Sequence, residues 1–383
     1  MRIQISEDLA EHSAVIKVIG VGGAGGNAIN RMAEAGIRGV DLVAANSDAQ
    51  DLRRSLAHVR VQIGDSLTRG LGVGGDSTKG RMAMLESESQ IKEILKGADL
   101  VFITGGMGGG TGTGGAPLVA SWAREMEILT IGVVTRPFSF EKSTRAAIAE
   151  EGIGEMRKSV DTLLVIPNQR LFDLIDSDTT TETAFKMADD VLRKSIQSIS
   201  DVITTPGIIN MDLNDIRAVM KDAGDALIGM GEASGPGRAE EAARAAVHSP
   251  LLENAAMDGA KRLSVNITAR KTSLRMSEID EAMSIIGGAA SPDAKIKVGA
   301  VYDESMEDAL RITVIATGFP GTKPHRRRAA LGPLSAEGGE KILGAGTALE
   351  AALTDAGSDG SSPADPAEWL KPAFLRFKAR KIK

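Results

Sequence analysis

Two glycine-rich segments constrain the fold of this chain more than any other feature of its sequence. The first, G-V-G-G-A-G-G at residues 20–26, follows the apolar run V-I-K-V-I at residues 15–19. The second holds eight glycines within residues 105–115 and follows the apolar run L-V-F-I-T at residues 100–104. A strand that leads through glycines into a helix can aim several backbone N–H groups at one anion. The sequence therefore predicts two phosphate-binding elements on neighbouring strands.

Apolar runs alternate with helical spacing along the first half of the chain. Further strands are predicted at residues 40–45, 130–134 and 162–166. Helical spacing covers residues 27–35, a second helix is expected to open at Pro117, and one long helix covers residues 180–200. Strands that alternate with helices are typical of a parallel sheet. We therefore expect an α/β fold, with a Rossmann-like parallel-sheet domain and a long central helix.

The pattern changes beyond about residue 225. Strands are predicted at residues 261–269, 296–301 and 310–316, and helices at residues 239–247 and 276–286, which together indicate a second, smaller α+β domain. Beyond residue 319, Pro, Gly, Ser, Ala and charged residues predict a disordered C-terminal tail. The expected organisation is a flexible N-terminus (1–13), a nucleotide-binding domain with the core helix near its end (14–200), a loop and its following helix (201–224), the smaller domain (225–319), a disordered linker (320–365) and a C-terminal peptide with a basic end (366–383).

The composition argues against several classes of protein. A net charge of −6 makes nucleic acid an unexpected partner of the whole chain. The chain has no cysteine and only four scattered histidines, so we expect no disulfide and no metal site built on thiolates or histidines. No stretch approaches 18 apolar residues, and the acidic N-terminus does not read as a signal peptide. We therefore expect a cytoplasmic protein with no transmembrane segment.

Taken alone, the first glycine segment also fits a dinucleotide-binding fingerprint, with Asp48 at about the distance of a ribose-binding acid. That pattern favours an NAD-dependent oxidoreductase, and a merely tight turn would explain it as well. An oxidoreductase gives no role to the second segment, whereas two such elements can cradle a triphosphate, with hydroxyl donors from Thr111 and Thr113. The pattern ending G-K-[ST] is absent, so the chain is not an ordinary P-loop NTPase.

Six stretches, taken in order, resemble the tubulin/FtsZ family of GTPases and in particular its bacterial cell-division branch. They are G-V-G-G-A-G-G-N-A at residues 20–28, A-N-S-D-A-Q at 45–50, L-T-R-G-L-G at 67–72, G-G-G-T-G-T-G at 108–114, V-V-T-R-P-F at 133–138 and I-A-T-G-F at 315–319. The resemblance implies a GTPase that assembles head to tail into protofilaments and hydrolyses GTP between subunits. It further implies a division ring beneath the inner membrane, and GTP or GDP as the bound nucleotide with Mg²⁺ carried on it.

The resemblance also assigns residues to the nucleotide site. Its phosphate contacts match Gly22, Gly23, Ala24, Gly25, Gly26, Asn27, Gly106, Gly108, Gly109, Gly110, Thr111, Gly112 and Thr113. Glu141 and Arg145 match the ribose and phosphate contacts, and Asn168 and Asp189 match the guanine contacts. A carboxylate such as that of Asp189 can accept from guanine N1–H and N2–H, a pair of donors that adenine lacks. Phe185, one helical turn before Asp189, either packs on the base or belongs to the core.

The family's catalytic loop, which enters the nucleotide site of the next subunit, matches I-N-M-D-L-N-D at residues 209–215. The resemblance implies that Asn210, Asp212 and Asp215 position and polarise the attacking water. The spacing alone favours the start of a helix with Asp212 as N-cap, and both roles can hold together. The family usually has Phe-Ala where this chain has Leu213 and Asn214, so a GTP-binding partner without turnover is an alternative.

Near its end the tail contains P-A-F-L-R, which resembles the family's C-terminal docking peptide for membrane tethers and division regulators. Its residues are Pro372, Ala373, Phe374, Leu375 and Arg376. A stray hydrophobic end explains the same residues, and Leu370 and Lys371 depart from the family pattern. The basic end either touches an anionic membrane or is solvated. A ring-forming protein and a non-ring cytoskeletal paralogue share the same chemistry, and the peptide favours the first.

Overall fold

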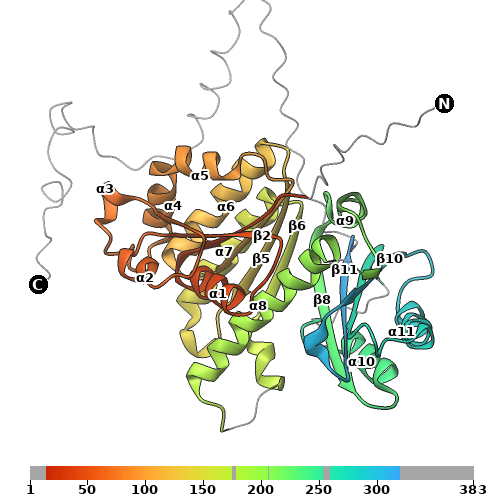
Figure 1. The fold of residues 1–383 in the computed structure, drawn as a ribbon. Coiled ribbons are helices and arrows are strands. Elements are labelled where there is room, and N and C mark those ends of the chain that lie inside the picture. Colours follow the sequence, from red (N-terminus) through yellow and green to blue (C-terminus); the bar gives the residue numbers. More distant parts are fainter. Residues whose placement is uncertain (1–13, 175–177, 206, 253–258, 320–383) are drawn as a thin grey trace, which may run out of the picture. The chain divides into compact units, whose positions relative to one another are not determined.

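The computed structural model describes residues 14–174, 178–205, 207–252 and 259–319. The strands of these residues form one eleven-stranded sheet, in the order β3-β2-β1-β4-β5-β6-β8-β11-β9-β10-β7 (Figure 1). The first six in that order pair in parallel: β3 (Val59–Gln62), β2 (Val40–Asn46), β1 (Ile16–Val21), β4 (Leu100–Gly106), β5 (Leu129–Arg136) and β6 (Thr162–Pro167). This confirms the expected α/β fold with a Rossmann-like parallel sheet.

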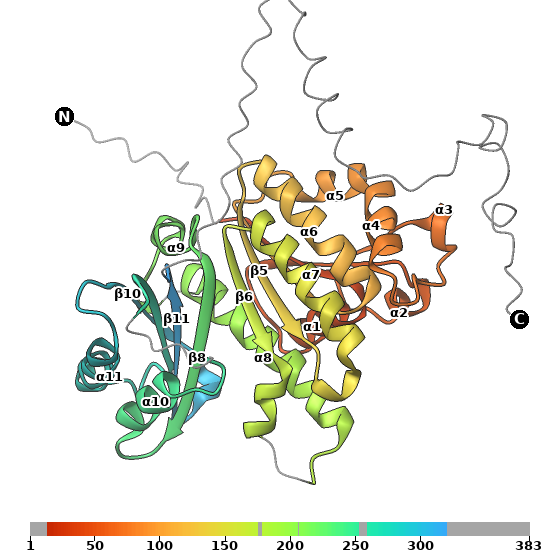
Figure 2. The same ribbon diagram turned by 180° about the vertical axis from the view of Figure 1, so that it is seen from behind.

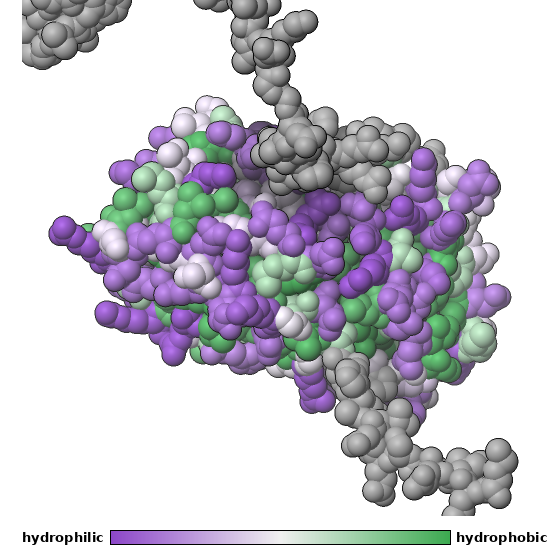
Figure 3. All heavy atoms as spheres, turned by 90° about the horizontal axis from the view of Figure 1, so that it is seen from above, coloured by the Kyte–Doolittle hydropathy of each residue, from purple (hydrophilic) through white to green (hydrophobic). Residues whose placement is uncertain are grey.

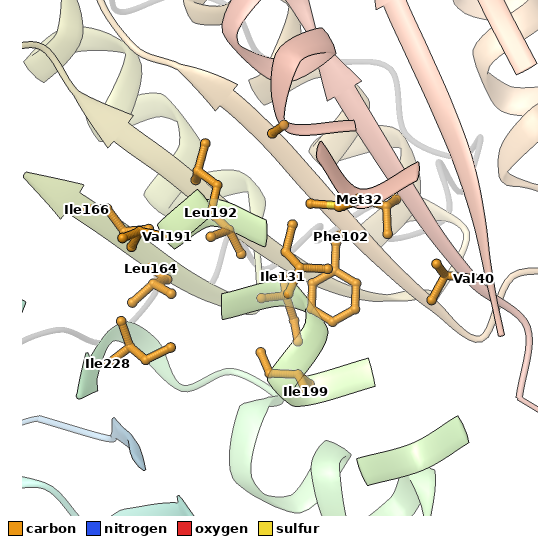
Figure 4. Close-up of a cluster of buried hydrophobic side chains, with 14 of the residues drawn as sticks. Met32, Val40, Phe102, Ile131, Leu164, Ile166, Val191, Leu192, Ile199 and Ile228 are labelled. Carbon is orange, nitrogen blue, oxygen red and sulfur yellow. The ribbon is translucent and has the colours of Figure 1, made fainter. Parts of the chain in front are cut away.

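Helices cover both faces of the parallel sheet, because successive side chains of a buried strand point to opposite faces. One layer consists of α1 (Gly22–Glu34) and α8 (Thr181–Thr204), and the other of α4 (Ser77–Glu86), α5 (Glu88–Leu95), α6 (Gly110–Glu125) and α7 (Ser143–Ser159). Phe102 of β4 faces the first layer and its neighbour Ile103 faces the second. Figures 1 and 2 show the two layers from opposite sides, and Figure 4 shows Phe102 beside Met32 of α1.

The long helix α8 runs four residues beyond its predicted end at residue 200. It is capped by Thr180, whose hydroxyl oxygen accepts a hydrogen bond from the Thr183 N–H. Leu192 and Ile199 are buried against the parallel sheet, and the Ser198 carbonyl accepts a hydrogen bond of 3.0 Å from the Asn266 side-chain amide. The helix therefore packs on both halves of the sheet.

The second half of the sheet is mixed and carries its own helices. It consists of β8 (Gly224–Ser234), β11 (Ala309–Thr317), β9 (Arg262–Ala269), β10 (Lys295–Tyr302) and β7 (Gly207–Ile209), with α10 (Arg238–Val247) and α11 (Met276–Ala289). Residues 162–164 of β6 pair with residues 224–226 of β8 and join the halves. The predicted second α+β region is thus present, and its five predicted elements appear within a few residues of their expected bounds.

The sequence did not predict β8, because Gly229 and Gly231 interrupt its apolar pattern. Both glycines serve close packing: a Cβ atom at Gly231 would lie 2.1 Å from the Ala242 carbonyl oxygen of α10. The helix can approach the strand only where side chains are missing.

Two predicted helix starts are wrong. The expected loop at residues 20–26 is mostly helical, because α1 already begins at Gly22. Likewise α6 begins at Gly110, so Pro117 lies inside the helix and does not open it. In both cases the glycines form the first turns of the helices, where unpaired backbone N–H groups gather.

The remaining short helices are α2 (Ala49–Arg53), α3 (Asp65–Thr68), α9 (Leu213–Met220) and the 3-10 helices η1 (Ser139–Glu141), η2 (Asn168–Leu174) and η4 (Glu304–Met306). Among the described residues, no helix is both long and apolar enough to cross a membrane. The expected flexible N-terminus, the linker 320–365 and the docking peptide 366–383 lie outside the described residues.

Candidate functional site

The first turns of α1 and α6 lie against each other at the carboxyl ends of β1 and β4. Gly22 has a φ of +73°, and a Cβ atom there would lie 3.0 Å from the backbone nitrogen of Gly112. At Gly25 a Cβ atom would lie 2.7 Å from the Thr104 carbonyl oxygen. The two predicted phosphate-binding elements therefore meet, as two helix N-termini, where backbone N–H groups lack partners within the helix.

The threonines of the second element have partners within the protein. The Thr113 hydroxyl oxygen accepts from the Gly108 N–H at 2.9 Å, and the Thr111 hydroxyl shares a hydrogen bond of 2.7 Å with Ser47. Gly108 adopts a φ of +96°. These hydroxyls thus help to fix the turn, and the Thr113 hydroxyl, which is the acceptor in its bond, still has a proton to donate.

Some glycines of this element serve packing. A Cβ atom at Gly110 would lie 2.5 Å from a methyl carbon of Val73, and one at Gly114 would lie 2.1 Å from the Ser77 carbonyl oxygen of α4. Helices α4 and α6 consequently approach each other backbone to backbone. The G-G-G-T-G-T-G motif combines an anion-binding turn with a helix–helix contact.

A polar pocket of about 590 Å³ opens beside the two glycine turns. Gly23 and Thr111 line it together with Asp48 and Asp51, which follow β2. The Asp51 carboxylate accepts from the Asn46 side-chain amide at 2.7 Å, and burial, together with the charge of Asp48, raises the pKa of Asp51. The sequence predicted no role in the phosphate site for either acid, although Asp48 lies in the matching stretch A-N-S-D-A-Q.

A second pocket of about 420 Å³ lies on the other side of α1. Asn27 and Arg31 of α1 line it together with Phe185 and Asp189 of α8. Burial raises the pKa of Asp189 to about 7, although the charge of Arg31 opposes the shift. The pocket thus offers a carboxyl group whose ionisation is sensitive to what it binds.

Asn168, at the start of η2 directly after β6, is buried. Its side-chain oxygen has no hydrogen-bond partner among the described residues. Because a buried acceptor without a donor is costly, this atom indicates a site for a ligand N–H group.

Phe185 is 40% exposed and therefore is not a core residue. Its ring meets Phe138 edge to face, with 5.3 Å between the ring centroids, and Phe138 also contacts Phe140 and Phe172. An aromatic surface consequently borders the second pocket.

Glu141 and Arg145 contact each other at 3.0 Å. The Glu141 carboxylate also accepts from the Phe138 N–H at 2.8 Å, so it holds the turn after β5. Arg145 is half-exposed, and its backbone packs against Gly108. The structure thus brings this pair to the second glycine element.

Asn210, Asp212 and Asp215 lie together, but at the opposite edge of the parallel sheet. The chain leaves α9 at residue 220, and the Ala223 N–H donates to the Asp161 carbonyl at the amino end of β6. The glycine turns lie at the carboxyl ends of the same set of strands, and Figures 1 and 2 show α9 remote from the start of α1. Residues 207–220 line neither of the two pockets.

The acid loop is held by its own side chains. Asp212 caps α9 by accepting from the Asp215 N–H at 2.8 Å, as the spacing predicted. The Asn210 side-chain oxygen accepts from the Gly207 N–H at 2.7 Å. Lys297 of β10, which sequence reasoning missed, donates to Asp215 at 2.6 Å and lowers the pKa of that carboxyl group.

Within the described residues, no group of three or more His, Cys, Asp or Glu side chains is placed to hold a metal ion. Asp48, the candidate ribose-binding acid of the oxidoreductase alternative, caps α2 by accepting from the Gln50 and Asp51 N–H groups. One carboxylate oxygen of Asp48, the residue to which the oxidoreductase alternative assigns the ribose, is therefore already hydrogen-bonded to backbone N–H groups.

Comparisons with known proteins identify the family to which this fold belongs. The Tubulin/FtsZ family GTPase domain matches residues 15–176, and the FtsZ family C-terminal domain matches residues 224–320. An empty FtsZ dimer of M. jannaschii is 41% identical, with a TM-score of 0.78, over 81% of this chain and 90% of that one. A mutant FtsZ of M. jannaschii is likewise 41% identical, with a TM-score of 0.77, over 80% of this chain and 92% of that one.

More distant structures share the fold alone. CetZ2 from Haloferax volcanii, a GTPgS-bound protofilament, is 20% identical with a TM-score of 0.68, over 81% of this chain and 95% of that one. Two family domains match the chain, and its identity to FtsZ is 41% over most of its length. These matches leave the oxidoreductase alternative without support. The chain belongs to the tubulin/FtsZ family of GTPases.

Proposed function

We propose that this chain is a polymerising GTPase whose hydrolytic site is completed by a second subunit. One observation carries the proposal: the glycine turns with their two pockets lie at one edge of the parallel sheet, and the acid loop lies at the other. A subunit with this arrangement binds nucleotide with one face and offers Asp212 and Asp215 on the opposite one.

The nucleotide side fits GTP or GDP. The backbone of residues 22–27 and 106–113 binds the phosphates, and Arg145 adds a positive charge beside them. Asp189 accepts from guanine N1–H and N2–H, Asn168 supplies its unpaired oxygen to a further donor, and Phe185 packs on the base. Mg²⁺ would be carried on the nucleotide, where it would neutralise phosphate charge, and Asp48 and Asp51, which both line the phosphate pocket, are the candidate carboxylates beside it.

The acid loop performs the hydrolytic step on the GTP of a neighbouring subunit. Asp212 and Asp215 orient and polarise the attacking water, and Asn210 holds the loop. Capping by Asp212 fixes the carboxylate on a helix end, which reduces the freedom that catalysis must restrict. Leu213 and Asn214 lie between the acids and leave both carboxylates in place.

Contacts of this kind join different faces of two identical subunits, and they generate filaments when the rotation between subunits does not close a ring. The FtsZ dimer of M. jannaschii and the CetZ2 protofilament support such association by analogy. We further propose that the filaments form the division ring under the cytoplasmic membrane, through a tail peptide at residues 372–376 that binds membrane tethers and regulators.

The test is the rate of GTP hydrolysis against protein concentration, with sedimentation of polymer in parallel. We expect almost no turnover below a threshold concentration, then a linear rise as polymer appears. Asp212→Ala and Asp212→Asn should both bind GTP and assemble but lose most turnover. The asparagine variant keeps the helix cap and therefore isolates the carboxylate. Turnover proportional to protein from the lowest concentration would show that each subunit hydrolyses alone.

A non-ring cytoskeletal role is a second candidate, because the fold is shared with CetZ proteins. Localisation of the full chain in dividing cells separates the two. Removal of residues 366–383 should leave GTP hydrolysis unchanged and abolish localisation to the division site. Normal ring localisation of the truncated chain would contradict the docking role of the tail.

A further inference from the structure

Lys297 is the cationic partner of the acid loop. Its ammonium group lies 2.6 Å from the Asp215 carboxylate, although the two residues are 82 positions apart in sequence. The Lys297 side chain is 45% exposed, so the ammonium group is accessible from the face that carries the acids. Figure 3 looks onto the side of the molecule where α9 lies, and its described surface is mostly hydrophilic.

The backbone holds Lys297 beside this loop through the sheet. Lys297 pairs with Ser264 of β9, and farther along β10 Ala300 pairs with Ile209 of β7, directly before Asn210. The strand that carries the lysine is therefore hydrogen-bonded to the segment that carries the acids. A lysine on a loop would lack this fixed position.

The charges around Lys297 come from both acids. Asp215 hydrogen-bonds it, Asp212 adds a second negative charge nearby, and together they raise its pKa, so the amine is a cation at neutral pH. Asp212 and Asp215 would otherwise bring two negative charges towards a triphosphate, which is itself strongly anionic. Like charges at short range oppose such an approach. A cation beside the two acids reduces their repulsion of the triphosphate.

We propose that Lys297 is a positioning residue of the hydrolytic site, which orients the Asp215 carboxylate and acts as the built-in counter-cation of the acid pair. The inference rests on the proposed role of Asp212 and Asp215. It adds a residue of the second half of the sheet to a site otherwise built from the loop and α9. The alternative is an ordinary surface ion pair, which would have little effect on stability or turnover.

The test compares Lys297→Met with Lys297→Arg and with the control Lys295→Met. Lys295 lies two residues earlier on the same strand, on the same side of its pleat, is exposed and forms no ion pair within the described residues. For each variant we would measure GTP affinity, the threshold concentration for assembly and turnover per sedimented subunit. The turnover measurement is then repeated over a series of KCl concentrations from low to high.

We expect Lys297→Met to bind GTP normally and to lose turnover per sedimented subunit roughly 10- to 100-fold, as expected when a reacting group is misplaced. Its threshold concentration should rise, and added KCl should restore part of its turnover relative to the control by screening the acids. Lys297→Arg should retain most turnover, and Lys295→Met should resemble the wild type. Lys297→Met within twofold of the control at every salt concentration would overturn the inference.

Two further variants separate this inference from the proposed function. If Asp212→Asn and Asp215→Asn hydrolyse GTP normally in polymer, the role of the acids fails. If they lose turnover while Lys297→Met retains it, only the role of Lys297 fails. Thermal unfolding of each variant controls for misfolding, and Lys297→Gln replaces the methionine variant if that protein does not fold.

Discussion

The carboxyl group of Asp189 combines burial with a proposed role in base recognition. Its pKa of about 7 means that, without nucleotide, the group is mostly protonated below neutral pH. Guanine N1–H and N2–H need acceptors, and only the ionised carboxylate offers both oxygens as acceptors. Guanine binding and proton release are therefore linked. Without nucleotide, the same shift weakens the folded state as pH rises from about 4 to 7, because the unfolded chain releases this proton earlier.

We expect the affinity for GDP to fall by up to about tenfold for each pH unit below pH 7, since binding releases one proton. Asp189→Asn should bind more weakly at pH 8 and show a shallower pH dependence. Titration calorimetry between pH 5.5 and 8 measures both. The nucleotide's phosphates titrate equally in the two experiments. If the affinity for GDP depended on pH with the same slope in both proteins, the proposed contact between Asp189 and the base would be contradicted.

At the scale of elements, α4 and α6 approach each other backbone to backbone. A Cβ atom at Gly80 would lie 2.2 Å from the Gly110 carbonyl oxygen, and one at Gly114 would lie 2.1 Å from the Ser77 carbonyl oxygen. The obstacles are backbone atoms of another helix, which cannot rotate away as a side chain can. This contact fixes the position of the turn that begins α6, and hence of Thr111 and Gly112.

Gly114→Ala should lower the free energy of unfolding by roughly 1–3 kcal/mol, the usual effect of overpacking a close contact. Gly154→Ala in α7 is the matched control, because a Cβ atom there meets nothing within 4 Å. Since alanine favours helix more than glycine does, the control should be neutral or slightly stabilising. Urea denaturation of both variants gives the comparison. Equal free energies of unfolding for the two variants would mean that α4 and α6 can move apart to accept a methyl group without loss of stability.

The sequence predicted those elements whose burial leaves a local pattern. Phe102 and Ile103 alternate between two buried faces, so β4 appears as a continuous apolar run. Strand β8 and the first turns of α1 and α6 were missed because glycine has low strand and helix propensity. At those places close packing against another backbone outweighs propensity, and only the folded chain shows that backbone.

In the candidate site, too, the features that are local in sequence were predicted and those that depend on long-range contacts were missed. The phosphate turns and the Asp212 cap are local in sequence, so motif and spacing predicted them. Lys297 reaches Asp215 across 82 positions, and the register of β10 decides which of its side chains faces the loop. No pattern within a short window contains that information.

At the scale of the whole molecule, the proposed division of the hydrolytic site between two faces would make activity a property of pairs of subunits. The nucleotide face of one subunit would then require the acid face of another. A subunit with a defective acid face should still serve as a neighbour that supplies GTP.

We expect wild-type protein below its threshold concentration to become active when an excess of Asp212→Asn is added, because mixed polymer brings wild-type acid faces to occupied nucleotide sites. Thr111→Arg, whose side chain would fill the phosphate pocket, should not replace Asp212→Asn in this assay. Phosphate release and sedimentation provide the readouts. Activity that stays at the level of the dilute wild type would contradict a shared site.

The capping role of Asp212, beside its proposed catalytic role, affects how this position is to be interpreted in relatives. Loss of its side-chain oxygen removes the capping hydrogen bond at the start of α9, at a cost of about 1 kcal/mol. This cost favours the few residues that cap helices at this position, whether or not the protein still hydrolyses GTP. A relative that had given up hydrolysis would have a structural reason to keep the aspartate, so its presence alone is weak evidence of an active enzyme.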